Sequence, residues 1–96
     1  MIGIVAKLKV AEGKNAEFEE VGKDLMAKVK ANESGTLTYQ LYRSSTDPQT
    51  YVFLEEYTNE EAVKAHGQTD YFKAAGAKFA GCLAGRPEIE RYDIVE

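Results

Sequence analysis

The fold is decided by residues 36–57, which read TLTYQLYRSSTDPQTYVFLEEY. Within residues 36–43, Leu37, Tyr39 and Leu41 alternate with more polar residues, which is the pattern of a β-strand with one buried face. Residues 51–57 predict a second strand, and the Asp-Pro pair between the two runs is typical of a turn. The stretch therefore predicts a β-hairpin. Since the second strand begins apolar on both faces, we expect the sheet to be covered on both sides.

Upstream of the hairpin, the sequence predicts one strand and one helix. Residues 2–10 alternate with the period of two that strands require, and a turn follows at residues 11–14. From Asn15 the apolar residues recur at helical spacing. This pattern ends near Ala31–Asn32, ahead of a Ser-Gly pair.

Downstream of the hairpin, two short helices and a last strand are expected. Thr58 and Glu61 have the spacing of a capping box, which predicts a helix over residues 59–66 that Gly67 ends. Thr69 is in position to cap a second helix. Residues 86–94 alternate weakly and predict an edge strand that begins next to a proline.

The resulting order, β-α-β-β-α-β, predicts an α+β fold of the ferredoxin-like class, with an antiparallel sheet and helices on one of its faces. The 96 residues suit a single domain spanning residues 1–96. The other sheet face also carries apolar residues and needs a cover. We therefore expect a homodimer in which two copies pair sheet against sheet.

Composition narrows the classes of partner. A net charge of −4 with no dense basic cluster argues against nucleic acid. No apolar run approaches the length of a membrane span, so we expect no membrane insertion, and the N-terminus lacks a secretory pattern. With one cysteine, Cys82, no intrachain disulfide forms, which fits a cytoplasmic location. One histidine and one cysteine at residues 66 and 82 offer no metal-ligand spacing, so we expect no metal.

His66 is the only histidine in the chain. One interpretation is structural, because a histidine near a helix C-terminus complements the helix dipole. The other is catalytic: four residues after the small Ala62, the ring can reach inward between helix and sheet. An imidazole among apolar and phenolic groups is a plausible general base near neutral pH.

Other side chains predict a pocket around His66. Leu37, Tyr39 and Leu41 of the hairpin can line the space beside it. Glu55 shares a strand face with Phe53 and Tyr57, and a carboxylate in an apolar layer needs a partner. Glu55 and Tyr57 therefore either orient a group in the site or make a contact across the dimer.

A longer stretch resembles a known family. The order and spacing of Gly35-Thr36-Leu37-x-Tyr39, the Asp-Pro turn, Glu55-x-Tyr57, Glu61-Ala62, His66 and Tyr71-Phe72 are similar to those of the antibiotic biosynthesis monooxygenase family, and in particular to small quinol-monooxygenase-like proteins. The resemblance covers nearly the whole chain. It implies a dimeric α+β barrel built from two ferredoxin-like subunits.

The resemblance also implies an activity. Relatives oxygenate quinols, anthrones or similar electron-rich aromatics with O2 and use neither metal nor flavin. It implies that His66 is the catalytic residue, which either takes the substrate's proton as a base or orients the oxygen, and that no cofactor is needed. The expected substrate-binding residues are Leu37, Tyr39, Leu41, Tyr71 and Phe72.

Three alternatives qualify this expectation. Haem-degrading relatives carry a tryptophan at the position of His66 and a haem-ligating histidine at that of Gly76. This chain has no tryptophan, so we do not expect haem degradation. Another branch isomerises small phosphorylated metabolites and also uses a histidine in this region. A dimer that binds a small molecule without catalysis is the third possibility.

Overall fold

Four strands and three helices alternate along the chain. The computed structural model describes residues 1–96. Its elements are β1 (Ile2–Lys9), α1 (Asn15–Asn32), β2 (Thr36–Arg43), β3 (Thr50–Tyr57), α2 (Glu60–Gln68), α3 (Asp70–Ala80) and β4 (Glu88–Asp93). The order is the predicted β-α-β-β-α-β, with the second helical segment divided into α2 and α3.

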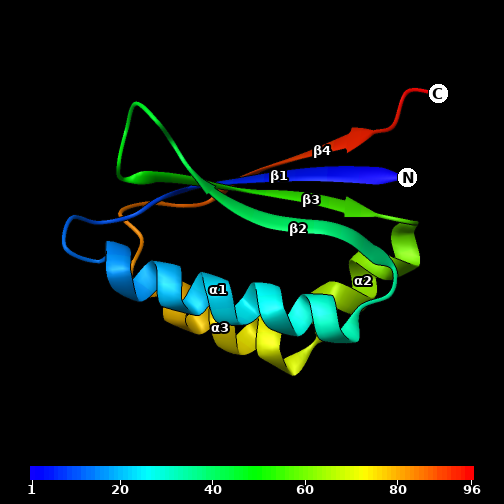
Figure 1. The fold of residues 1–96 in the computed structure, drawn as a ribbon, viewed down its shortest axis with the longest axis horizontal. Helices are drawn as coiled ribbons and strands as arrows, with labels where there is room; N and C mark the ends of the chain where they lie inside the picture. Colours follow the sequence, from blue (N-terminus) through cyan, green and yellow to red (C-terminus); the bar gives the residue numbers. More distant parts are fainter.

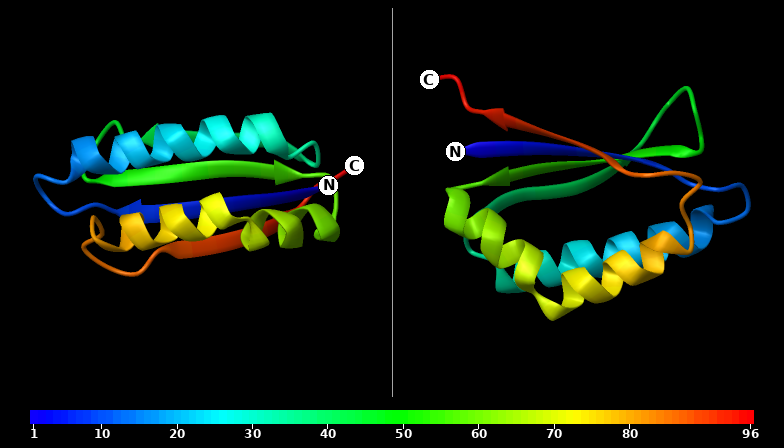
Figure 2. Two further views of the ribbon diagram at one scale, coloured as in Figure 1. Left: turned by 90° about the horizontal axis from the view of Figure 1, so that it is seen from below. Right: turned by 180° about the vertical axis from the view of Figure 1, so that it is seen from behind.

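The strands form one antiparallel sheet in the order β2-β3-β1-β4. All three helices lie on the same side of this sheet (Figure 1). Viewed from the helical side, α2 and α3 follow one another along the sheet beside α1 (Figure 2). The ferredoxin-like prediction is therefore confirmed. None of the helices combines the length and the apolar composition needed to cross a membrane.

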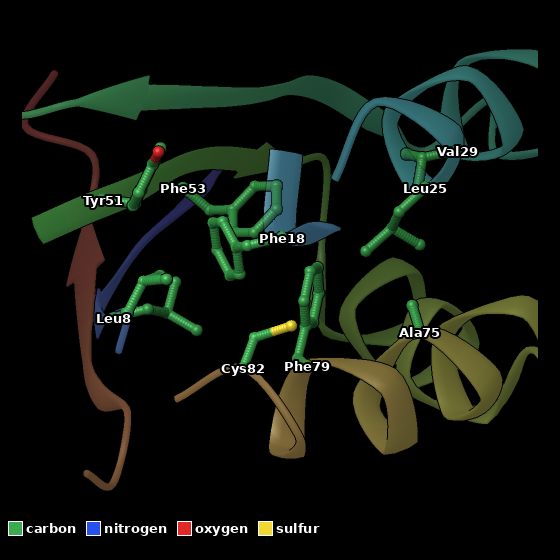
Figure 3. Close-up of a cluster of buried hydrophobic side chains, with 10 residues drawn as sticks. Leu8, Phe18, Leu25, Val29, Tyr51, Phe53, Ala75, Phe79 and Cys82 are labelled. Carbon is green, nitrogen blue, oxygen red and sulfur yellow. The ribbon is translucent and has the colours of Figure 1, made fainter. Parts of the chain in front are cut away.

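The core lies between the sheet and the helices. The buried residues of α1 recur at helical spacing, as the sequence pattern predicts, and they are Phe18, Gly22, Leu25 and Val29. The Phe18 ring packs 4.7 Å from Tyr51 and 4.9 Å from Phe79, centroid to centroid (Figure 3). A Cβ at Gly22 would lie 2.7 Å from Leu41 Cδ2, so the glycine permits the close approach of α1 to β2.

The caps of α2 and α3 differ in how well the sequence predicted them. The prediction of a capping box at Thr58 is wrong. The cap of α2 is Asn59, whose side chain accepts a hydrogen bond from the Ala62 amide at 3.0 Å. Thr58 instead donates its backbone N–H to the Gly35 carbonyl, at 2.9 Å. The Thr69 cap of α3 is confirmed, since its hydroxyl accepts from the Phe72 amide.

Gly35 brings the start of β2 against α2. A Cβ at this position would lie 2.8 Å from the Cβ of Ala62 and 3.3 Å from Oγ1 of Thr58. Because Gly35 has no Cβ and Ala62 is small, the turn between α1 and β2 can touch α2. The contact holds the C-terminal end of α1 next to α2.

The sheet face turned away from the helices has no cover within the chain. Side chains alternate along a strand, so residues next to the helix-facing ones point outward. We call this the outer sheet face; its larger apolar residues are Val5, Tyr42, Val52, Leu54 and Tyr92. Leu54, Tyr42 and Tyr92 are 39%, 54% and 50% exposed. These large side chains are solvent-accessible in the single chain.

We expect Gly35→Ala to destabilise the fold by about 1–3 kcal/mol, because the added methyl meets the Ala62 Cβ and forces the turn away from α2. Chemical denaturation followed by circular dichroism measures this free energy of unfolding. Gly85→Ala is the matched control, since a Cβ there meets nothing within 4 Å. Equal stabilities of the two variants would contradict the prediction.

Candidate active site

A cavity of about 410 Å³ lies between the sheet and the α2–α3 pair. Seventeen residues line it, and twelve of them are hydrophobic. The polar groups that reach it come from His66, Glu55, Tyr39 and Tyr57, and no lysine or arginine contributes to its wall. Such a lining suits a largely apolar ligand with a small number of polar groups.

His66 enters the cavity from α2. The residue is 5% exposed. Its ring packs against aromatic rings of three elements, with centroid distances of 4.9 Å to Tyr39, 5.6 Å to Tyr57 and 4.6 Å to Phe72. Nε2 is the one buried side-chain nitrogen or oxygen without a hydrogen-bond partner. The ring is therefore fixed by packing while one of its nitrogens stays free.

The other nitrogen of His66 has a carboxylate partner. Nδ1 lies 2.9 Å from Oε1 and 3.1 Å from Oε2 of Glu33, at the C-terminal end of α1. The Thr36 hydroxyl donates to Oε1 at 2.7 Å, and the Tyr71 hydroxyl donates to Oε2. The side chains of His66 and Glu33 are 7% and 9% exposed, so little water reaches the pair.

The sequence prediction missed Glu33. A signal for it existed, because an acidic residue at a helix C-terminus opposes the helix dipole and needs another reason to be there. That reason is the set of hydrogen-bond partners from β2, α2 and α3, which only the folded chain assembles.

Glu55 is the second acidic group of the site. Burial raises the pKa of Glu55 to about 7, the hydrogen bond from Tyr57 opposes this shift, and the negative charge of Glu33 adds to it. The Tyr57 hydroxyl donates to Oε1 of Glu55 at 2.6 Å. Burial also raises the pKa of the Tyr39 phenol above its usual value, which keeps the phenol neutral. Near neutral pH the phenol of Tyr39 is therefore neutral, and Glu55 lies between its protonated and ionised forms.

The expected site residues fall into two groups. His66, Glu55, Tyr57, Tyr39 and Phe72 line the cavity together. The remaining three do not line it. Leu37 is 52% exposed, Leu41 packs beside Gly22, and Tyr71 contacts Glu33.

Two glycines, Gly67 of α2 and Gly76 of α3, also line the cavity. A Cβ built at either position meets no atom within 4 Å. Both glycines are exposed, so the space beside them is open.

The arrangement is suited to proton transfer. A buried imidazole with one free nitrogen can accept a proton from a ligand hydroxyl, and a carboxyl that titrates near neutral pH can donate or accept another. No group of three or more His, Cys, Asp or Glu side chains lies close enough to hold a metal ion.

Comparison with known proteins identifies relatives over the whole chain. The model of the family described as antibiotic biosynthesis monooxygenase matches residues 1–78. The crystal structure of a candidate antibiotic biosynthesis monooxygenase from Caulobacter crescentus is 58% identical in sequence and superposes with a TM-score of 0.96. The similarity covers 99% of this chain and 90% of that chain.

Two further relatives are each 30% identical. The candidate monooxygenase YcnE of Bacillus subtilis matches over 100% of both chains. An uncharacterised protein of Synechocystis matches over 99% of this chain, which spans 64% of that protein's length.

The raised pKa of Glu55 predicts a pH dependence of stability. Between its usual pKa of 4.5 and about 7, the folded state holds a proton that the unfolded state has released, so the wild type loses stability as pH rises through this window. Glu55→Gln removes the titrating group. We expect the stability of the variant relative to wild type to rise by on the order of 2 kcal/mol between pH 5 and pH 8.

Urea denaturation of both proteins at the two pH values measures this difference. Glu20→Gln, an exposed change on α1, is expected to show none. A constant difference between Glu55→Gln and wild type across the window would refute the assignment.

Proposed function

Because the chain belongs to the antibiotic biosynthesis monooxygenase family, we propose that it is a cofactor-independent monooxygenase that oxidises a quinol, an anthrone or a similar electron-rich aromatic with O2. The observation that carries the proposal is the unpartnered Nε2 of His66 in an apolar cavity. A buried nitrogen without a partner costs free energy, and a ligand hydroxyl would satisfy it.

The first step is removal of a proton from the substrate. Nε2 accepts the proton of an acidic O–H, or of the enol form of an anthrone, and leaves an electron-rich anion. The neutral, aromatic wall of Tyr39, Tyr57 and Phe72 excludes water from this anion. Exclusion of water strengthens the attraction between the anion and the new imidazolium.

The second step consumes O2, and the substrate supplies the electrons. The anion gives one electron to O2, and the resulting radical and superoxide combine to form a carbon–oxygen bond. The peroxide takes up the proton held by His66. For an anthrone, loss of water from this hydroperoxide converts the CH2 carbon to a carbonyl, so that one O2 gives one new C=O and one H2O.

The cavity favours this substrate class over a phosphorylated metabolite. Phosphate groups are usually bound by arginine, lysine or clusters of backbone N–H groups. The wall contains no lysine or arginine, and it places the acidic Glu55 inside. A flat, neutral aromatic with one or two hydroxyls fits the volume and the polarity better.

The proposal includes a homodimer. The outer sheet face exposes Tyr42, Leu54 and Tyr92, and the chain itself has nothing to cover them. A second copy placed sheet against sheet would bury this surface, as the dimeric α+β barrel requires. Each copy would keep its own cavity on the helical side of its sheet.

His66→Gln is the direct test of the base. Glutamine retains the approximate size and can still donate to Glu33, but it has no basic nitrogen. We expect O2 consumption with hydroquinones, naphthohydroquinones or anthrones to fall about 10²–10⁴-fold, the usual contribution of a general base. An oxygen electrode measures the rate after subtraction of autoxidation.

The exposed Glu20→Gln variant serves as the activity control, and circular dichroism confirms that both variants are folded. Equal rates for wild type and His66→Gln would remove His66 from the reaction. Ligand binding by the wild type without any O2 uptake above the blank would replace the oxygenase by an isomerase or a binding protein.

Leu54→Glu tests the dimer. A carboxylate in the middle of the outer sheet face is costly to bury against a second sheet, so we expect the variant to elute as a 10.6 kDa monomer while the wild type has twice that mass. Size-exclusion chromatography with light scattering at micromolar concentration measures both. A monomeric wild type would contradict the prediction.

A further inference from the structure

We propose that Glu33 is the positioning residue of the site: it holds His66 in the one neutral tautomer that leaves Nε2 free to accept a proton. The tautomer of His66 can be measured without turnover, although its catalytic role rests on the function proposed above. It follows from the donors around Glu33, from the free Nε2 and from the position of the pair.

The hydrogen bonds around Glu33 decide the tautomer. An ionised carboxylate accepts hydrogen bonds and donates none. The hydroxyls of Thr36 and Tyr71 already donate to its two oxygens. Nδ1 of His66, 2.9 Å from Oε1, must then also be a donor. A neutral imidazole carries a single N–H, so Nε2 is left with its lone pair.

The position of Nε2 at the cavity gives this tautomer a functional meaning. The atom is buried without a partner while its residue lines the cavity. A histidine kept only for packing has no need of an unsatisfied nitrogen, because buried polar atoms are nearly always paired. The opposite tautomer would point an N–H into the cavity and leave no base there.

Glu33 also stabilises the protonated ring. When Nε2 takes a proton, the imidazolium is surrounded by Tyr39, Tyr57 and Phe72. The carboxylate in contact with Nδ1 compensates its charge, in the way that an acidic residue supports the histidine of a catalytic triad. Glu55, at the same cavity, is the other acidic group near the ring.

Glu33 is held from the side opposite the cavity. It lines an outer crevice together with Thr36, Ala62, Ala65, Thr69 and Tyr71. On α2, Ala62 and Ala65 contribute to this crevice, whereas Val63, His66 and Gly67 face the cavity. The carboxylate therefore supports His66 from behind and does not occupy the space of a ligand.

Because the chain has one histidine, nitrogen-15 NMR of labelled imidazole reports on His66 alone. In the neutral ring of the wild type we expect a single tautomer, with the proton on Nδ1 and a bare Nε2. Glu33→Gln replaces the acceptor by an amide that can accept or donate, so we expect a mixture of the two tautomers. Glu20→Gln is expected to leave the wild-type spectrum unchanged.

Turnover provides the second measurement. We expect Glu33→Gln to lower kcat at least about tenfold with little change in KM, because the charge that supports the imidazolium is lost, and Glu33→Asp to recover part of the rate. A wild-type spectrum with the proton on Nε2 would overturn the inference, even if Glu33→Gln proves unable to fold. The predicted tautomer in a protein without O2 uptake would uphold the positioning role and reject the oxygenase.

Discussion

The contact between Glu33 and His66 is the interaction on which the site depends. It joins residues 33 positions apart, one at the C-terminal end of α1 and the other on α2. The contact is possible because Gly35 lets the turn after α1 touch Ala62. The same turn leads into β2. One close approach therefore positions both the start of this strand and the Glu33–His66 contact. Without Glu33, His66 would still line the cavity, but its Nδ1 would lack the carboxylate that we propose holds the proton there.

The surroundings of this pair explain the electrostatics of the cavity. Glu33 and Glu55 are two carboxyls close enough for the charge of one to raise the pKa of the other. Tyr57 donates to Glu55, and Tyr71 donates to Glu33. Each acidic group thus has a phenol as a partner. The two phenols thus satisfy both carboxyls, while Nε2 of His66 is left without a hydrogen-bond partner.

The sequence predicts the elements well because periodicity is a local property. The hairpin of β2 and β3, the helix α1 and the Thr69 cap follow from spacing alone. Leu37 shows where this reasoning fails, since an irregularity between Thr36 and Thr38 shifts the register. The assumption that Leu37 shares a face with Tyr39 and Leu41 does not allow for it. Glu33 was missed for a related reason, because its partners come from three other elements and no spacing records them.

Two glycines of the cavity wall are positions at which a larger side chain would change the shape of the cavity. Gly67 of α2 and Gly76 of α3 both line the cavity, and a Cβ at either position would meet no atom within 4 Å. Replacement by a larger residue would reduce or reshape the cavity without displacing the Glu33–His66 pair. These two positions are separate from the acid–base pair that we propose. In the function proposed here, a larger side chain at either glycine would change which ligands the cavity accepts and leave the Glu33–His66 contact in place.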